Sequence, residues 1–146
     1  MAECVFYQII NGDSPTSLVY EDSTSLGFMD IHPVNPGHVL VIPKKHSAFL
    51  SDMEPEECAH LFTVAVRIAA AVPTSGIRCE GMNLILADRE AAGQEIFHVH
   101  VHVIPRFSGD GFGFRFGPGY SILPGRGELD EHARQIRTAL KPLPAQ

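Results

Sequence analysis

Three histidines alternate with three valines in the segment His98-Val99-His100-Val101-His102-Val103-Ile104-Pro105-Arg106. Side chains of a β-strand point alternately to its two faces, so the segment predicts a strand with the three imidazoles on one face and the valines on the other. We expect the valine face to lie in the core. At about 3.3 Å per residue the imidazoles stand roughly 6.6 Å apart, a row long enough to line a phosphate chain.

The three histidines place three imidazole groups side by side. Near neutral pH imidazole acts as a nucleophile, as a general acid or base, or, when protonated, as a charged donor to a phosphoryl oxygen. A central His100 is placed to attack phosphorus while its neighbours hold the other oxygens, and this needs no metal in principle. Two other interpretations stay open. The histidines could bind zinc, although no acid stands at the helical His-Glu-x-x-His spacing, or they could be surface residues of a half-exposed strand.

The periodicity of the flanking sequence predicts a mixture of strands and helices. Strand-like segments lie at residues 18–20, 26–30, 37–42, 82–87 and 97–104. Apolar residues at three- and four-residue spacing predict one long helix over 55–72 and a C-terminal helix over about 128–140. A loop rich in glycine and phenylalanine, 107–120, shows no period. This order predicts one α+β domain over residues 1–146, with helices packed on an antiparallel sheet.

The composition is that of a globular protein without a basic stripe. Of 146 residues, 45% are hydrophobic and 19% are charged, with a net charge of −6, which excludes disorder and collagen-like repeats. No apolar run reaches the roughly 20 residues of a membrane span, and the N-terminus lacks a signal-peptide pattern, so we expect a cytoplasmic protein. The three cysteines form no Cys-x-x-Cys pair, which argues against a disulfide framework. The acidic balance argues against a long nucleic-acid partner but allows a small phosphorylated ligand.

The histidine segment resembles the signature of the histidine triad (HIT) family, His-φ-His-φ-His-φ-φ, where φ is apolar. Two upstream segments, Phe28-Met29-Asp30-Ile31 and Pro36–His46, are similar to the second and third strands of that family. Ala92-Gly93-Gln94 stands where the family has its phosphate-side loop. The resemblance covers most of the chain and implies a HIT-like fold of roughly five antiparallel strands, with its core at about residues 4–106.

The resemblance also implies a nucleotide-binding hydrolase or nucleotidyl transferase. The family cleaves a nucleoside 5′-phosphoryl bond through a covalent nucleotidyl-histidine and releases a nucleoside monophosphate. Carried over to this sequence, His100 is the nucleophile, His102 and His38 contact the phosphate, and His98 lies near the leaving group. Asp30 matches the acid that accepts hydrogen bonds from the ribose hydroxyls. The other nucleotide-binding positions are the apolar base slot, Val5, Phe6, Ile9, Phe28 and Ile31, and the phosphate-side residues Gln94 and Glu95.

Two positions depart from the family pattern and leave the substrate open. Glu95 stands where many members carry Ser or Thr, and a carboxylate there repels phosphate unless it is protonated. Ala87 replaces an Asn or Gln near the bridging atom. Both a Hint-like phosphoramidase and a Fhit-like dinucleoside polyphosphate hydrolase therefore remain open. The alternative from another class is a nucleotide-binding or interaction module with incidental slow hydrolysis.

Zinc is bound by some bacterial-type members of the family through two cysteines and two histidines. Cys4, His46 and His98 match three of these ligands, whereas Tyr7 stands at the second cysteine position. Because a closed structural site requires four ligands, we predict no structural zinc, and the reaction requires no cofactor.

The expected partner is a purine nucleotide or a nucleotide conjugate. The resemblance also implies a homodimer, for which helix 55–72 and strand 82–87 are the expected contact. Neither a long nucleic acid nor a membrane is expected as a partner.

Overall fold

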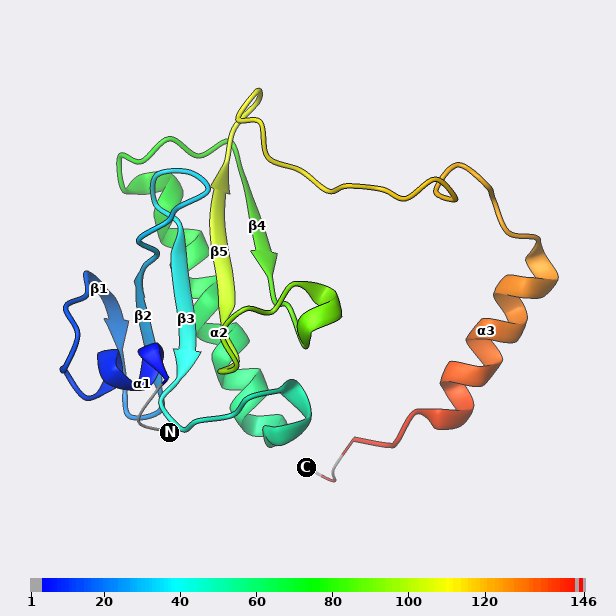
Figure 1. Ribbon diagram of the computed structural model, residues 1–146, viewed down its shortest axis with the longest axis horizontal. Coiled ribbons are helices and arrows are strands. Elements are labelled where there is room, and N and C mark those ends of the chain that lie inside the picture. Colours follow the sequence, from blue (N-terminus) through cyan, green and yellow to red (C-terminus); the bar gives the residue numbers. More distant parts are fainter. Residues whose placement is uncertain (1–3, 144, 146) are drawn as a thin grey trace. The chain divides into compact units, whose positions relative to one another are not determined.

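The computed structural model describes residues 4–143 and 145. The chain divides into two compact units, Met1–Phe112 and Gly113–Gln146 (Figure 1). In chain order the helices and strands are α1 (Val5–Ile10), β1 (Leu18–Glu21), β2 (Ser25–Met29), β3 (Val39–Pro43), α2 (Pro55–Ala71), β4 (Gly81–Ile85), β5 (Val101–Arg106) and α3 (Arg126–Ala139), with short 3-10 helices at Leu50–Asp52, Val72–Thr74 and Glu90–Ala92. The expectation of one domain over residues 1–146 stays a prediction.

The five strands form one sheet in the order β1-β2-β3-β5-β4. Every neighbouring pair is antiparallel, which confirms the predicted α+β class and the five-stranded antiparallel sheet. Strand β5 lies between β3 and β4, and its His102 pairs with Leu40 of β3 and with Ile85 of β4. The second half of the histidine segment therefore lies in the interior of the sheet, and β4 is an edge strand.

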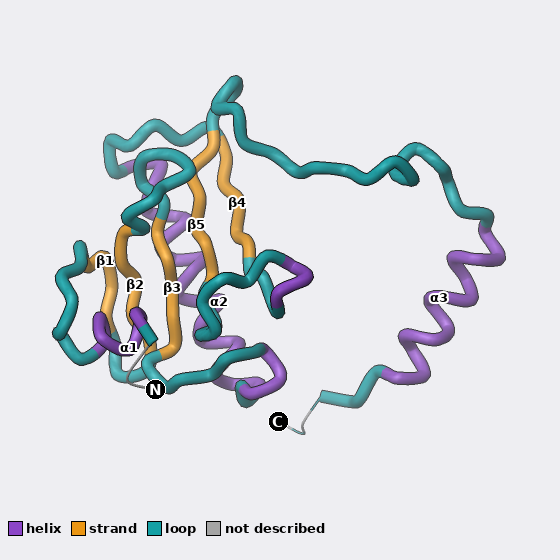
Figure 2. The backbone as a smooth tube through the Cα atoms, in the orientation of Figure 1, coloured by secondary structure: helices purple, strands orange, loops and turns teal. Residues whose placement is uncertain are grey.

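Each face of the sheet carries its own hydrophobic core. Helix α2 covers one face, where Val101 and Val103 pack with Val64 and are at most 1% exposed (Figures 1 and 2). This confirms the prediction that the valines of the histidine segment face the core. Helix α1 packs on the opposite face, where the buried side chains are Phe6, Leu26, Phe28, Leu40 and Ile42. Burying a side chain of this size contributes about 1.5–3 kcal/mol relative to leaving it exposed.

The fifth strand starts later than the sequence predicts. We expected a strand over 97–104, but β5 begins at Val101 and continues through Arg106, so His98 and His100 precede it. Pro43 at the end of β3 has no N–H with which to continue the ladder. The backbone N–H of Val99 instead donates to the carbonyl of Ser47 at 2.7 Å. This bond holds the segment around Val99 against the loop that follows β3.

The α-helices agree with the sequence except for α1, which it did not predict. Helix α2 begins at the predicted proline and ends one residue early, and Glu57 accepts the backbone N–H of Glu54 at 2.9 Å to cap it. Helix α3 also lies close to its predicted range, within the second unit. Helix α1 was not predicted, although Val5, Phe6 and Ile9 on it were expected to line the base slot.

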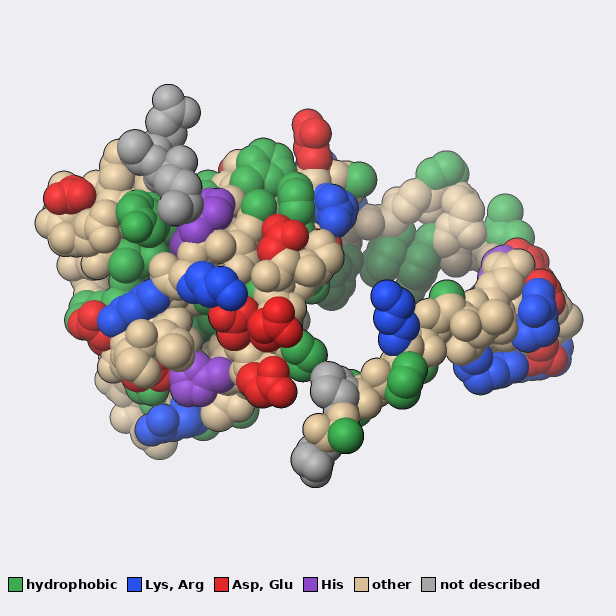
Figure 3. All heavy atoms as spheres, turned by 90° about the horizontal axis from the view of Figure 1, so that it is seen from below, with side chains coloured by type: hydrophobic (Ala, Val, Ile, Leu, Met, Phe, Trp, Pro, Cys, Tyr) green, Lys and Arg blue, Asp and Glu red, His purple; other side chains and the backbone are tan. Residues whose placement is uncertain are grey.

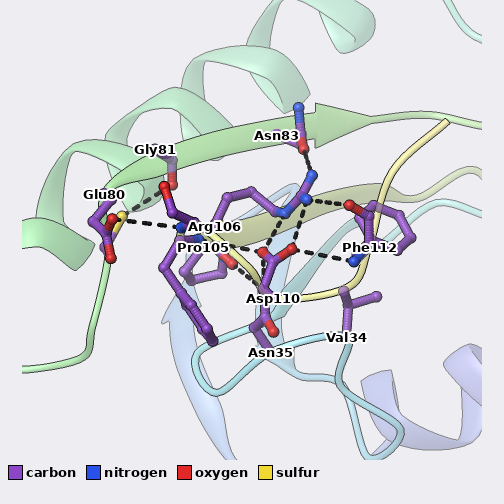
Figure 4. A network of polar contacts seen from close by, with 12 residues as sticks. Val34, Asn35, Glu80, Gly81, Asn83, Pro105, Arg106, Asp110 and Phe112 are labelled. Carbon is purple, nitrogen blue, oxygen red and sulfur yellow. Dashed lines mark hydrogen bonds and ion pairs between the residues drawn. The ribbon is translucent and has the colours of Figure 1, made fainter.

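A polar network ties the turn after β5 to the loop before β3 (Figure 4). Arg106 donates to both carboxylate oxygens of Asp110, at 2.6 and 2.8 Å, and its guanidinium holds the pKa of that carboxyl well below the usual range. The Nδ2 of Asn35 donates to Asp110 at 2.8 Å and to the carbonyl of Pro105 at 2.9 Å. The loop that contains Val34 and Asn35 is thereby fixed beside β5, immediately before His38.

Two glycines with the same positive φ angle test how tightly this loop is packed. Gly37 and Gly76 both have φ +90°, but a Cβ on Gly37 would lie 2.9 Å from Ile77 and 3.1 Å from Pro105, whereas a Cβ on Gly76 would meet nothing within 4 Å. Both alanine variants carry the backbone strain of about 1–2 kcal/mol, and Gly37→Ala adds an overpacking cost of about 1–3 kcal/mol. Urea unfolding should therefore show a larger loss of stability for Gly37→Ala, and equal losses would contradict the packing at this loop.

Candidate functional site

Four histidines gather on the α1 face of the sheet, where β3 and β5 lie side by side. His38, His98 and His100 are buried, whereas His102 is half-buried. The ring centroids of His100 and His102 lie 4.9 Å apart, and those of His38 and His102 lie 5.2 Å apart. The ring centroids of His100 and His102 are therefore closer than the roughly 6.6 Å expected from the spacing of alternate residues on a strand. The structure brings all four predicted catalytic histidines into one cluster.

His100 has a free nitrogen because its other nitrogen is committed to the backbone. Its Nδ1 lies 2.7 Å from the carbonyl oxygen of His98. A carbonyl only accepts, so Nδ1 carries the proton and donates. In the neutral ring Nε2 then has an unshared electron pair, which is the form that a nucleophile requires.

The tautomer of His38 is assigned in the same way from a backbone amide. The N–H of Val34 donates to His38 Nδ1 at 3.0 Å, so the ring proton of neutral His38 lies on Nε2. This Nε2 lies 2.9 Å from Nδ1 of His102 and 3.5 Å from a carboxylate oxygen of Asp30. His102 accepts at Nδ1 and therefore carries its own proton on Nε2.

Burial keeps these imidazoles neutral at pH 7. Desolvation lowers the pKa of His98 and of His102 to about 4, and it lowers the pKa of His38 and His100 as well. The Asp30 carboxylate opposes this effect at His38, and the carbonyl of Pro43 opposes it at His98. The cluster thus offers neutral donors and one neutral nucleophile.

His98 joins the site to a second cluster with metal-binding geometry. Its Nε2 donates to the carbonyl of Pro43 at 2.7 Å, which leaves Nδ1 as the acceptor nitrogen. That Nδ1 lies 3.2 Å from Nδ1 of His46 and 3.6 Å from Sγ of Cys4, and all three atoms lie within 4.8 Å of one another. A histidine that binds metal commonly donates its other N–H to a carbonyl, so these residues fit three ligands of a zinc ion. Among residues 4–143, this group contains no fourth histidine, cysteine or acid.

The residues expected to bind the nucleoside are only partly brought together. The rings of Phe6 and Phe28 meet edge-on at 5.6 Å, and Phe6 also meets the rings of His98 and His100, at 5.8 and 5.2 Å. Ile9 packs against this cluster. Asp30 uses one carboxylate oxygen to accept the N–H of His32 at 2.8 Å, and its other oxygen faces His38. The side chains of Val5 and Ile31 are exposed, at 43% and 85%.

The loop before the histidines holds Gln94 and Glu95 in different environments. Gln94 is buried, and its amide accepts the N–H of Arg89 at 2.7 Å and donates to the carbonyls of Ala48 and Ile96 at 2.7 and 3.1 Å. Its side chain thus organises the loop. Glu95 is exposed and lines a hollow of about 510 Å³ together with Glu90, Gly93, Gln94 and Phe97.

Sequence reasoning missed the groups that set the proton positions. The carbonyl of His98, the carbonyl of Pro43 and the N–H of Val34 each fix one imidazole. Backbone groups carry no residue-type signal, so no pattern could have identified them.

Comparisons with known proteins place the fold and the sequence in one family. The HIT domain family matches residues 11–109. A crystal structure of a HIT family protein from Bacillus anthracis superposes with a TM-score of 0.86 at 37% identity, covering 95% of this chain and 98% of that one. A zinc-bound histidine triad family protein from Mycobacterium smegmatis gives a TM-score of 0.74 at 40% identity, covering 95% and 99%.

One relative with a named activity also matches most of the chain. The adenosine 5′-monophosphoramidase of Schizosaccharomyces pombe is 35% identical over 122 residues, which are 83% of this chain and 87% of that protein. The match to the family extends over more than half of the chain and includes all three histidines of the motif. The chain therefore belongs to the histidine triad family.

Proposed function

We propose that this protein hydrolyses a nucleoside 5′-phosphoryl bond through a covalent nucleotidyl-His100. The observation that carries the proposal is the set of hydrogen-bond partners from which the proton positions of His100 and His102 follow. His100 presents a bare Nε2, and the adjacent His102 presents an Nε2–H. A nucleophile beside a hydrogen-bond donor is the arrangement that attack on a phosphoryl group requires.

In the first step Nε2 of His100 forms a bond to the α-phosphorus, and the bond from phosphorus to the leaving group breaks. The leaving group departs with the bonding electron pair and takes a proton from solvent. His100 then bears a positive charge, and the carbonyl of His98, 2.7 Å from Nδ1, stabilises it by a charge-assisted hydrogen bond. His102 donates to a non-bridging oxygen as negative charge builds up there.

In the second step water attacks the same phosphorus. The new phosphorus–oxygen bond forms, the phosphorus–nitrogen bond breaks, and the electron pair returns to Nε2 of His100. The proton of the water passes to solvent, and a nucleoside monophosphate leaves. Asp30 and the apolar side chains of Phe6 and Phe28 hold the nucleoside, so that phosphorus stays in line with His100.

A phosphoramidate is the substrate class that we favour over a dinucleoside polyphosphate. The family resemblance places Glu95 on the phosphate side of the site, and Glu95 and Glu90 line the same hollow. Carboxylates on that side disfavour a leaving group that carries further phosphates. An amine leaving group lacks that charge and is able to donate a hydrogen bond to Glu95. The activity named for the Schizosaccharomyces pombe relative also supports this class.

Replacing the nucleophile provides the direct test. His100→Ala should lower AMP release from adenosine 5′-phosphoramidate by roughly 10⁴-fold or more, because removal of a covalent nucleophile abolishes both steps. Chromatography of the products gives the rate, and mass spectrometry of wild-type protein quenched in alkaline denaturant, in which the phosphorus–nitrogen bond is stable, should show an added adenylyl group that the variant lacks. Calorimetry should show that the variant still binds AMP.

The same measurements separate hydrolysis from a role in binding alone. If the wild-type protein binds AMP tightly but releases none from phosphoramidate, diadenosine triphosphate or diadenosine tetraphosphate, the protein is a nucleotide-binding module. If hydrolysis survives His100→Ala, another residue is the nucleophile.

The charge of Glu95 predicts a change in substrate preference. Glu95→Gln removes one negative charge at constant size, so the rate for diadenosine tetraphosphate relative to phosphoramidate should rise by roughly tenfold, the effect of about 1–2 kcal/mol of repulsion near the surface. Parallel steady-state assays of both substrates give this ratio. Glu56→Gln, the same charge change on α2, should leave the ratio unaltered. An unchanged ratio in Glu95→Gln would remove the electrostatic basis of the preference.

We also propose that the chain keeps no tightly bound zinc. Cys4, His46 and His98 supply three ligands, and a bound ion would orient His98, but a stable structural site needs a fourth protein ligand. After dialysis against a chelator, elemental analysis should find little zinc in the wild-type protein and about one ion per chain in Tyr7→Cys. Adding Cys4→Ser to Tyr7→Cys should abolish this retention. Stoichiometric zinc in the dialysed wild-type protein would refute the proposal.

The proposed partners are a nucleotide and a second copy of the chain. The edge strand β4 and the exposed apolar side chains of Phe62 and Val66 on α2 support the homodimer. On the face shown in Figure 3, basic and acidic side chains are interspersed. We propose no long nucleic-acid partner, which would require a continuous basic surface. Each helix among the described residues is too short or too polar to cross a membrane. A cytoplasmic location stays a prediction.

A further inference from the structure

We propose that His38 is a positioning residue that holds His102 in its Nε2–H tautomer, and that Asp30 couples this hold to binding of the sugar. The inference rests on the proposed function and refines it. His38 does not contact the phosphate in this scheme. It acts through His102, which does.

The surroundings of His38 allow its ring proton on only one of the two ring nitrogens. The backbone N–H of Val34 donates to Nδ1 of His38 at 3.0 Å. Protonating that nitrogen would place two N–H groups against each other and break the bond. The neighbouring Asn35 is buried and anchored to Pro105 and Asp110, so the loop cannot move away freely (Figure 4). The proton of His38 therefore lies on Nε2.

This position determines the tautomer of His102. Nε2 of His38 lies 2.9 Å from Nδ1 of His102. The alternative tautomer of His102 would direct a second N–H at the first across the same short distance. His102 therefore keeps Nδ1 bare and presents Nε2–H. In serine proteases an aspartate holds the catalytic histidine in the correct tautomer, and loss of that tautomer lowers kcat by about 10⁴-fold.

The same three side chains lie close enough to be mistaken for a metal site. Asp30, His38 and His102 each offer a ligand atom within 4.8 Å of the others. A metal needs the unshared electron pair of a ring nitrogen, and Nε2 of His38 carries a proton instead. Hydrogen bonding between the rings therefore accounts for this group better than metal binding does.

Asp30 links the sugar site to this pair. Its backbone N–H donates to the carbonyl of His38 at 3.0 Å, and its free carboxylate oxygen lies 3.5 Å from Nε2 of His38. The carboxylate therefore attracts the same proton that His102 accepts. When ribose hydroxyls donate to Asp30, they satisfy its charge, and the proton of His38 is committed to His102. A bound sugar thus strengthens the hold on His102.

Two variants of equal size test the hold on His102. His38→Gln keeps an N–H donor near the position of Nε2, whereas His38→Glu offers only acceptor oxygens. Long-range ¹H–¹⁵N spectra report which ring nitrogen of His102 is protonated, with assignment from His102→Asn. We expect Nε2–H in the wild-type protein and in His38→Gln, and Nδ1–H in His38→Glu. The kcat for phosphoramidate should fall by more than about 100-fold in His38→Glu and by less than about tenfold in His38→Gln.

The spectrum of the wild-type protein does not depend on the folding of any variant. A wild-type His102 protonated on Nδ1 would overturn the proposal outright. Equal losses of kcat in His38→Gln and His38→Glu, with His102 remaining Nε2–H in both, would show a merely structural role for His38.

The coupling to the sugar is tested by pairing a change in the protein with a change in the substrate. Adenosine 5′-phosphoramidate and its 2′,3′-dideoxy analogue are compared on the wild-type protein and on Asp30→Asn. We expect the analogue to lower kcat as well as to raise KM in the wild-type protein, and to lower kcat little further in Asp30→Asn. A change in KM alone would refute the coupling. If the wild-type protein hydrolyses neither substrate, the proposed function fails, while the spectra still decide the tautomer of His102.

Discussion

Burial of three imidazoles and partial burial of a fourth, on one face of the sheet, is the constraint on which the site depends. A buried imidazole cannot easily hold a charge, and an unpaired ring nitrogen costs free energy, so each ring must find partners of the correct kind. The partners that decide the proton positions are backbone groups, the carbonyls of His98 and Pro43 and the N–H of Val34. Because a backbone group cannot exchange its donor or acceptor character, it fixes the tautomer of the ring permanently.

The end of the β3–β5 ladder makes these backbone groups available. The two strands pair from Val39–Val103 to Val41–Val101 and then separate, since Pro43 has no N–H to offer. The chain bends at His98, whose N–H donates to the carbonyl of Ile96, and Val99 still packs in the same buried cluster as the valines of the strand. The segment from His98 to His100 is nevertheless free of the ladder, so the carbonyl of His98 can accept from an imidazole instead of a neighbouring strand. A complete strand through His98 would have kept the side chains aligned and lost this acceptor.

Periodicity in the sequence predicted the framework of the molecule well, because alternation and helical spacing record which side chains are buried. The valine row, helix α2 and the five strands follow from that record. Helix α1 was missed because six residues carry too short a pattern, although Phe6 and Ile10 lie at helical spacing and Asn11-Gly12 marks an end. The role of Gln94 was also missed, because nothing in the sequence around it indicates that its side-chain amide forms hydrogen bonds with three backbone groups.

The two ends of the histidine row have become chemically different although the residue type is the same. At the first end, His98 donates to Pro43 through Nε2 and turns a bare Nδ1 toward Cys4 and His46, the form that a metal or a thiol proton can use. At the last end, His102 accepts at Nδ1 and keeps its proton on Nε2, the form that a phosphoryl oxygen can use. His100 between them donates at Nδ1 and keeps Nε2 bare. A sequence of identical imidazoles thus yields three distinct functional groups, because each ring meets a different backbone or side-chain partner.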